Sequence, residues 1–171
     1  MNIVINTLTP EVLDKYKTDN FIEFGTYKGN GCKLAFFMGF KNIHSIEIDD
    51  FYYNLNKISL GRFKNIHLYK GSTLDVLPEL LEKIDEQSTF WIDSHNDNDC
   101  PILKELEILS THKIKNHILL IDDMRMFGTA THEFITIDQI IQSIKKINPD
   151  YHISYETSPC GFNDIMVARV L

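Results

Sequence analysis

The segment NFIEFGTYKGN, residues 20–30, decides how this chain folds. Its apolar part, FIEF, predicts a short buried strand, which Gly25 ends. Gly29 and Gly31 then open an apolar helical pattern that continues over residues 32–40. A strand, a tight glycine turn and a helix N-terminus form a common site for nucleotide-like ligands. Gly25 can adopt positive φ, and the free N–H groups of the helix point at whatever binds there.

A carboxylate about twenty residues further on supports this interpretation. The segment HSIEID, residues 44–49, predicts a second strand with Glu47 near its C-terminal end. In α/β nucleotide sites, a carboxylate at this place accepts hydrogen bonds from ribose hydroxyls. The glycine spacing is G-x-x-x-G-x-G, unlike the G-x-G-x-x-G of nicotinamide enzymes. Taken alone, the glycines could mark a simple loop and helix start, and Glu47 could be a solvated strand end.

Apolar runs alternate with helical patterns along the rest of the chain. Five apolar strands separated by helices predict a doubly wound α/β sheet that is buried on both faces. The connection between the last two strands is too short for a crossover helix, so these strands should pair antiparallel. We expect one domain over residues 1–171, with strands at residues 21–24, 43–48, 66–69, 89–92, 117–121, 151–156 and 165–170 and helices at residues 10–16, 32–40, 51–60, 74–84, 101–109 and 135–147.

Composition narrows the function classes. The chain has 171 residues, a formal charge of −7 and scattered Lys and Arg, which argues against non-specific nucleic acid binding. No apolar run is long enough to cross a membrane, and residues 1–10 lack signal-peptide features. The three cysteines are far apart and show no C-x-x-C spacing, so neither a disulfide framework nor a zinc site is indicated. A reduced, cytoplasmic setting without membrane association is the expectation.

Acidic and hydroxyl groups gather where the predicted strands end, and ligands of doubly wound sheets bind at that edge. The residues at these ends are Gly25, Glu47, Gly71, Ser72, Asp93, Asp122 and Asp123. Adjacent strands lie about 4.8 Å apart, so Asp93 and Asp122 can share one ion if their strands are neighbours. Three carboxylates that meet without a basic neighbour would repel one another strongly, and a hard cation such as Mg²⁺ would relieve this repulsion.

With these strand ends, the chain resembles the class I methyltransferases that use S-adenosylmethionine, over essentially its whole length. The segment EFGTYKG looks like their first motif, Glu47 matches their ribose-binding acid, and Gly71 and Ser72 fall where such enzymes contact adenine. The resemblance implies a Rossmann-like sheet of about seven strands in the order 3-2-1-4-5-7-6, with the last strand antiparallel. The cofactor-binding residues that it implies are Glu23, Gly25, Thr26, Tyr27, Gly29, Glu47, Ile48, Gly71, Ser72 and Asp93.

More narrowly, the segments WIDSH and LIDD resemble the metal-dependent O-methyltransferases of the catechol type and the macrocin and novobiocin sugar type. This resemblance implies that Asp93, Asp122 and Asp123 hold Mg²⁺. His95 stands where part of the sugar group has an acid that is a candidate base, so His95 and Asp93 are the predicted catalytic residues. An imidazole with an ordinary pKa near ~6.5 could take the proton of an acceptor hydroxyl. Alternatively, residues 93–99 form only a polar turn, and Asp122 and Asp123 only cap or start the loop before Met124.

Other residues near these segments could also contribute. Asn96 or Asp97 could replace His95 as the base, and His132 and Glu133 could reach the same mouth from the loop after the fifth strand. Arg125 could bind an anionic substrate or only pair with an acid.

The resemblance is incomplete at the N-terminus. Only about 19 residues precede the first strand, whereas members of the metal-dependent group usually have extra N-terminal helices that cover substrate. An open site, a partner protein, a homodimer that completes the pocket, or a loss of activity therefore stay open. A dimer edge could be formed by the last two strands.

The main expectation is Mg²⁺-assisted O-methylation of a hydroxyl on a sugar or another small molecule. The alternatives are a metal-independent methyltransferase acting on a protein, RNA or amine group, and a non-catalytic binding module of this fold. A nicotinamide-dependent reductase is less well supported, because the glycine spacing differs and a Tyr-x-x-x-Lys pair is lacking.

Overall fold

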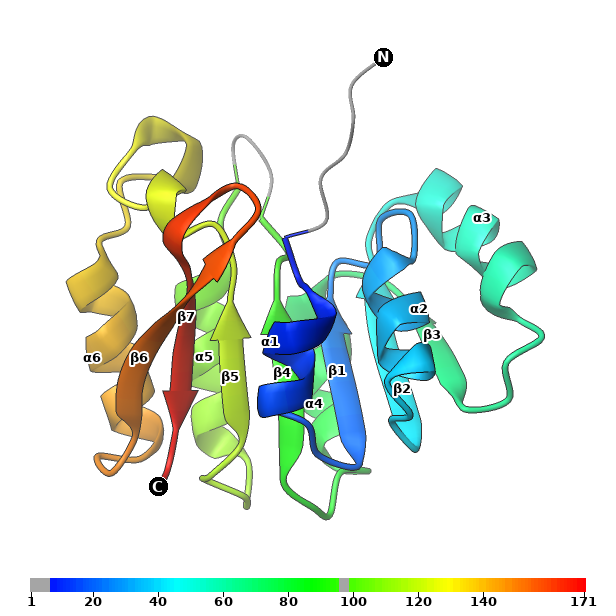
Figure 1. Ribbon diagram of the computed structural model, residues 1–171, viewed down its shortest axis with the longest axis horizontal. Helices are drawn as coiled ribbons and strands as arrows, with labels where there is room; N and C mark the ends of the chain where they lie inside the picture. The colour runs from blue at the N-terminus through cyan, green and yellow to red at the C-terminus, as the bar shows by residue number, and fades with distance from the viewer. Residues whose placement is uncertain (1–6, 96–98) are drawn as a thin grey trace.

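The computed structural model describes residues 7–95 and 99–171 and contains a seven-stranded sheet in the order β3-β2-β1-β4-β5-β7-β6 (Figure 1). Strands β1 to β5 are parallel neighbours, and β7 pairs antiparallel with both β5 and β6. The order and the antiparallel last strand confirm the predicted sheet. The strands are β1 Asn20–Phe24, β2 Asn42–Glu47, β3 Ile66–Lys70, β4 Ser88–Ile92, β5 Ile118–Ile121, β6 His152–Ser158 and β7 Gly161–Arg169.

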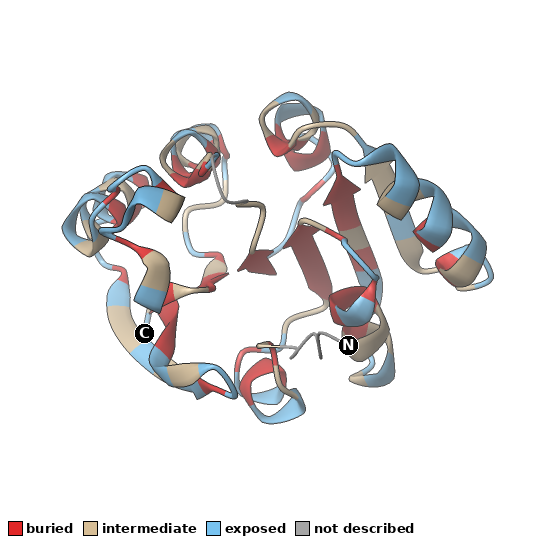
Figure 2. Cartoon of the chain, turned by 90° about the horizontal axis from the view of Figure 1, so that it is seen from above, coloured by how far each residue is buried: buried red, intermediate tan, exposed pale blue. Residues whose placement is uncertain are grey.

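Helices cover both faces of this sheet, as Figure 2 shows from above. One apolar cluster joins the sheet to α4, α5 and α6 through Leu77, Leu106 and Ile140, and the other joins it to α1, α2 and α3. Within the part of the chain that the structure describes, no helix has the length and apolar character needed to span a membrane. The helices are α1 Pro10–Lys15, α2 Asn30–Phe37, α3 Asp50–Leu60, α4 Thr73–Leu81, α5 Ile102–Thr111 and α6 Ile137–Ile147.

The central strands explain why the predicted strands are continuous apolar runs. Every residue of β1 and of β4 is buried. Ile22 and Phe24 belong to the cluster under α4, α5 and α6, whereas Phe21 belongs to the cluster under α1, α2 and α3. Side chains alternate across a strand, so a strand that is covered on both faces needs apolar residues at successive positions.

Most predicted boundaries shift by up to four residues, and the helices expected to reach residues 40 and 84 end at Phe37 and Leu81. Two of these shifts have identifiable reasons. The helix expected at residues 32–40 is α2, which begins at Asn30 because Gly29, with φ +72°, is its N-cap. The closing strands are longer than expected and run into a tight turn, with Ser158 paired to Gly161. The residues near that turn are polar, but ladder hydrogen bonds are formed by the backbone and tolerate polar side chains on an outer hairpin.

A pair of buried histidines connects the start of β4 with the segment before β5. The backbone N–H of Ser88 donates to His117 Nδ1 at 3.0 Å, which assigns the ring proton of His117 to Nε2. That proton is shared with His112 Nδ1 at 2.8 Å, and His112 Nε2 donates to the carbonyl of Ile84 at 3.2 Å. All these hydrogen bonds are made when both rings are neutral. Burial lowers the pKa of His117 to about 3 and also lowers the pKa of His112.

We expect these histidines to make folding sensitive to acid. The unfolded chain gains a proton on His117 below about pH 6.5, whereas the folded chain does not until about pH 3, so stability falls across this window as pH decreases. Each such histidine contributes up to about 1.4 kcal/mol per pH unit. In urea unfolding measured across the window, His117→Asn should show a shallower pH dependence than the wild type. The exposed-site control His152→Asn should keep the wild-type slope, and an unchanged slope in His117→Asn would contradict the prediction.

Candidate functional site

The turn after β1 is clamped between two neighbouring strands. The N–H groups of Gly25 and Thr26 both donate to the carbonyl of Ile46 in β2, at 3.0 and 3.2 Å. Gly25 has φ +89°, and a Cβ at this position would lie 2.6 Å from the carbonyl oxygen of Asp93. Only glycine fits here, because any side chain would push β1 away from the residue that follows β4.

The carboxylate of Glu47 is fixed at the end of β2 by two backbone groups. Its Oε2 accepts from the N–H of Tyr27 at 2.7 Å, and its Oε1 accepts from the N–H of Asp49 at 2.8 Å. Tyr27 adopts φ +46°, and its ring packs against Tyr52 with a centroid distance of 4.5 Å. Each carboxylate oxygen keeps a further lone pair, so Glu47 can accept two more hydrogen bonds from a ligand.

A cleft of about 490 Å³ opens at the carboxyl ends of β1 to β4. This volume lies within the range of small-molecule and cofactor pockets, roughly 300–1,000 Å³. Many residues expected at a cofactor or catalytic site line this one cleft, namely Gly25, Tyr27, Glu47, Ile48, Gly71, Ser72, Asp93 and His95.

Three other predicted cofactor residues lie elsewhere. Glu23 and Thr26 line a smaller cavity of about 80 Å³, which shares Gly25 and Asp93 with the larger cleft. Gly29 is not among the residues that line either cavity. A Cβ on Gly29 would lie 2.4 Å from a side-chain oxygen of α3, so this glycine allows α2 and α3 to approach each other.

Glu23 lies beneath the glycine turn and is 2% exposed. Its Oε2 accepts hydrogen bonds from the hydroxyl of Ser45 at 2.6 Å and from the thiol of Cys32 at 3.1 Å. A Cβ on Gly31 would lie 1.8 Å from its Oε1. Burial raises the pKa of Glu23 to about 7, although the two hydrogen bonds act in the opposite direction. The geometry makes Glu23 a support of the turn that also reaches the smaller cavity.

Three aspartates meet at the ends of β4 and β5, which are neighbouring parallel strands. Asp93, Asp122 and Asp123 each place one oxygen so that all three lie within 4.8 Å of one another. Asp122 is 2% exposed, and its Oδ1 has no hydrogen-bond partner among residues 7–95 and 99–171, whereas Oδ2 accepts from the hydroxyl of Thr7. Burial, followed by the neighbouring Asp123 charge, raises the pKa of Asp122 to about 7. Burial and the two neighbouring charges also raise the pKa of Asp93.

These oxygens fit a hard divalent cation. Mg²⁺ and Ca²⁺ prefer oxygen ligands, and a cation would satisfy Asp122 Oδ1, which no described residue contacts by a hydrogen bond, as well as offset the repulsion. The residues expected to hold Mg²⁺ are therefore brought together in a suitable arrangement.

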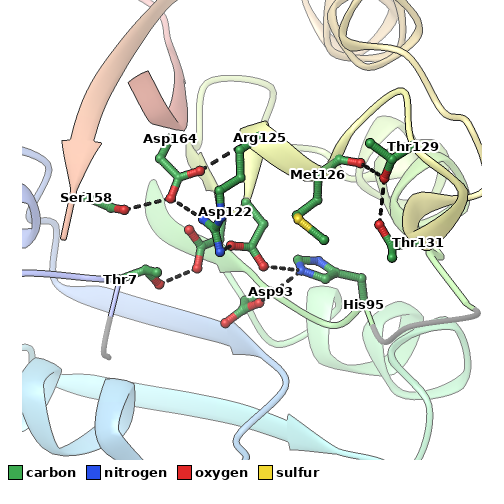
Figure 3. A network of polar contacts seen from close by, with 11 residues as sticks. Thr7, Asp93, His95, Asp122, Arg125, Met126, Thr129, Thr131, Ser158 and Asp164 are labelled. Atoms are coloured by element: carbon green, nitrogen blue, oxygen red, sulfur yellow. Dashed lines mark hydrogen bonds and ion pairs between the residues drawn. The ribbon is translucent and has the colours of Figure 1, made fainter. Parts of the chain in front are cut away.

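A basic residue nevertheless lies beside them, so the assumption of a cluster without a basic neighbour is wrong. Arg125 Nη2 lies 2.5 Å from Asp123 Oδ1, and its Nη1 pairs with the fully buried carboxylate of Asp164 in β7 (Figure 3). The alternatives for Arg125 were anion binding and pairing with an acid, and the structure shows the pairing. Arg125 pairs with Oδ1 of Asp123, which leaves Oδ2 for other partners.

His95 occupies that other oxygen. Its Nε2 lies 2.9 Å from Asp123 Oδ2 and 3.6 Å from Asp93 Oδ1. Burial opposes ionisation of Asp123, but the hydrogen bond from His95 and the charges of His95 and Arg125 outweigh it and lower the pKa of Asp123. The ring of His132 packs on His95 with a centroid distance of 4.2 Å.

The remaining candidates are placed less directly. Glu133 accepts a long hydrogen bond of 3.4 Å from the backbone N–H of Cys100. Asn96 and Asp97, the alternative bases, lie outside the described residues.

Sequence reasoning missed a buried acid below the cleft. Glu105 of α5 is fully buried, and its Oε1 accepts hydrogen bonds from the hydroxyls of Thr73 and Ser94, the latter at 2.6 Å. Burial raises the pKa of Glu105. The available signal was a carboxylate next to Leu106, on the apolar face of the predicted helix. A charge in that position needs partners from other elements, so it should have been assigned to the interior.

Comparisons with known proteins identify the class of fold. No family model and no curated protein matches the sequence. An O-methyltransferase from Bacillus cereus solved with S-adenosylhomocysteine superposes with TM-score 0.65 and 12% identity, over 95% of this chain and 78% of that one. TomG from Streptomyces achromogenes, an O-methyltransferase of tomaymycin synthesis solved with S-adenosylmethionine, gives 0.60 and 16%, over 94% and 77%. Aeropyrum pernix fibrillarin with bound S-adenosylmethionine gives 0.62 and 12%, over 89% and 66%.

The chain therefore has the Rossmann-like fold of S-adenosylmethionine-dependent methyltransferases. The resemblance that the sequence motifs indicated is confirmed at the level of the fold. Identities of 12–16% carry no residue roles, so the roles of the site residues rest on the geometry described above.

Arg125 should contribute to stability through Asp164, whose carboxylate is buried. Replacing Arg125 by Met leaves the buried Asp164 charge without its cation and should lower the free energy of unfolding by about 2–3 kcal/mol. This is at the lower end of, or below, the loss seen when one partner of a fully buried ion pair is removed, because Arg125 is partly exposed. Urea unfolding would measure this loss. Adding Asp164→Asn to the variant should recover part of it, because the unpaired charge is removed. Additive losses in the double variant would contradict the pairing argument.

Proposed function

We propose that this protein is an S-adenosylmethionine-dependent methyltransferase. The observation that supports it best is the Glu47 carboxylate, held by two backbone N–H groups at the edge of a cleft that also contains Gly25 and Asp93. A fixed carboxylate after the second strand, facing a glycine turn after the first, suits a ligand with a ribose. The solved structures of the same fold that contain S-adenosylmethionine or S-adenosylhomocysteine agree with this ligand.

In this proposal, different residues of the cleft contact different parts of S-adenosylmethionine. Glu47 accepts hydrogen bonds from the ribose hydroxyls, while Ile48, Gly71 and Ser72 flank the adenine. The turn at Gly25 and Tyr27 lies against the methionine part, because a residue without a side chain allows close backbone approach. Thr26, Glu23 and Gly29 keep the turn in shape from behind. Bound S-adenosylmethionine supplies an electrophilic methyl group on a sulfonium.

We further propose a metal-assisted reaction on a hydroxyl of a sugar or other small molecule. Asp93, Asp122 and Asp123 would hold Mg²⁺, for which the unpartnered oxygen of Asp122 is the main support. Mg²⁺ bound there would lower the pKa of an acceptor hydroxyl and orient it.

The chain's own residues then place and deprotonate the acceptor. His95 lines the same cleft as Gly25, and its Nε2 is held by Asp123, so its ring has a defined orientation. It is the proposed base that removes the hydroxyl proton. Asp93 belongs to the aspartate cluster and its backbone lies against Gly25, so it connects the proposed metal site with the glycine turn. Holding the two reactants in contact is the main contribution expected of such an enzyme.

A second candidate is a metal-independent methyltransferase that acts on an amine, a protein or an RNA group. The observation that favours it is Arg125, which already compensates Asp123 and Asp164. In that case the aspartates would be structural and metal removal would not matter. A non-catalytic module of this fold would bind no S-adenosylmethionine at all. We also propose that a homodimer or a partner protein completes the pocket for the methyl acceptor.

The cofactor assignment predicts a specific loss of affinity. Glu47→Gln should weaken S-adenosylhomocysteine binding by roughly 10- to 100-fold, because hydrogen bonds to a charged group contribute about 1.5–3 kcal/mol. Isothermal titration calorimetry measures it, with the exposed-site variant Glu79→Gln as the control that should bind like the wild type. If the wild type binds no S-adenosylhomocysteine under all conditions tested, with and without Mg²⁺, both enzyme proposals are ruled out.

The metal assignment predicts a loss of turnover without a loss of cofactor binding. Asp122→Asn, or EDTA, should lower methyl transfer to catechol or sugar acceptors by about 100-fold or more, because the metal's contribution is worth several kcal/mol. Transfer of a radiolabelled methyl group measures the rate, and Asp150→Asn on the surface is the matched control. Turnover that survives both EDTA and Asp122→Asn would favour the metal-independent enzyme instead.

A further inference from the structure

A second group of possible metal ligands lies beside the three aspartates and contains nitrogen. His95, Asp123 and His132 each place one ligand atom so that all three lie within 4.8 Å of one another. They come from three separate elements, namely the segment after β4, the end of β5 and the 3-10 turn η2, Ala130–His132. The group shares Asp123 with the aspartate cluster but differs from it in ligand chemistry.

His132 is the observation that points to a ligand. It is 3% exposed, and neither of its ring nitrogens has a hydrogen-bond partner among the described residues. Buried polar groups are normally paired, so an unpaired buried imidazole needs an explanation such as an ion. Its ring faces His95 at a centroid distance of 4.2 Å and an interplanar angle of 52°, with Phe127 edge-on behind it at 4.8 Å.

The other two members already aim their ligand atoms at one point. Arg125 holds Oδ1 of Asp123, which leaves Oδ2 facing His95 Nε2 at 2.9 Å. Figure 3 shows the His95 ring directed toward the carboxylates rather than toward the Thr129 and Thr131 hydroxyls. The arrangement is thus fixed by an ion pair on one side and by aromatic packing on the other.

We propose that His95, Asp123 and His132 form a binding site for a divalent transition-metal ion such as Zn²⁺ or Co²⁺. Two imidazoles and one carboxylate suit such ions, whereas an all-oxygen set suits Mg²⁺ or Ca²⁺. The two clusters therefore select different metals although they are adjacent. An ion in the nitrogen-containing site would occupy His95 Nε2 and take it away from any role as a base. The site does not depend on the proposed methyltransferase activity.

The test is metal binding by the full chain after chelator treatment. Titrated with Co²⁺ alone, the wild type should bind one ion and develop the visible d–d absorption of four- or five-coordinate Co²⁺, which is stronger than that of six-coordinate Co²⁺ in water. His132→Phe keeps a ring of similar size against His95 and Phe127 but removes the ligand, and it should weaken Co²⁺ binding at least about 10-fold. His152→Phe, at an exposed position on β6, is the matched control and should bind like the wild type.

A measurement on the wild type protects the test against a variant that fails to fold. On addition of Zn²⁺, the ring nitrogens of His95 and His132 should shift in ¹⁵N NMR spectra, while those of His152 should not. Unshifted His95 and His132 resonances, or equal Co²⁺ affinity in wild type and folded His132→Phe, would overturn the proposal. Titration with S-adenosylhomocysteine in the same samples separates this outcome from a failure of the cofactor assignment.

Discussion

The concentration of negative charge at one edge of the sheet is the constraint on which the site depends. Parallel pairing of β4 and β5 brings Asp93 next to Asp122 and Asp123, and the antiparallel β7 adds Asp164 from the far side. Buried carboxylates at such distances are costly unless cations or hydrogen bonds compensate them. Arg125 contacts both Asp123 in the aspartate cluster and Asp164 in β7. A single side chain therefore connects the hairpin of β6 and β7 with the carboxyl ends of β4 and β5.

The negative charges of the aspartates are compensated to different degrees, and this difference distinguishes Asp123 from Asp122. Asp123 is paired on both oxygens, by Arg125 and by His95, and its pKa is lowered. Asp122 has one oxygen on the Thr7 hydroxyl and one without a partner in the part of the chain that the structure describes, and its pKa is raised to about 7. A cation entering the cluster would thus gain most from Asp122 and Asp93, whereas Asp123 is already positioned by its partners.

Much of this arrangement could be predicted from the sequence because it follows from strand ends. The carboxyl ends of parallel strands share an edge, so placing Glu47, Asp93 and Asp122 after apolar runs was enough to predict that they lie at the same edge of the sheet. The same reasoning explains Gly25, which must lie where two strand ends touch. Secondary structure patterns and topology rules were sufficient for these residues.

The rest depends on contacts that local patterns do not contain. Asp164 lies 39 residues beyond Arg125, on a strand whose polar start resembled a loop, so their ion pair was not visible. His132 belongs to a polar loop but is buried, and the rings of Phe127 and His95 pack against it. Glu105 lies inside with its Oε1 accepting from hydroxyls of α4 and of the segment after β4, while its Oε2 has no hydrogen-bond partner among the described residues. Each case depends on side chains from separate elements.

The shared position of Asp123 makes the two ligand groups interdependent. The oxygen cluster needs an oxygen of Asp123 together with Asp93 and Asp122, while the nitrogen-containing group needs an oxygen of the same residue together with His95 and His132. Arg125 already occupies Oδ1, so the two groups draw on Oδ2. Two cations at such a short separation would also repel each other. If both groups bind cations as proposed, occupation of one would lower the affinity of the other, and the relative supply of hard and borderline metals would determine whether His95 remains available for its proposed role as a base.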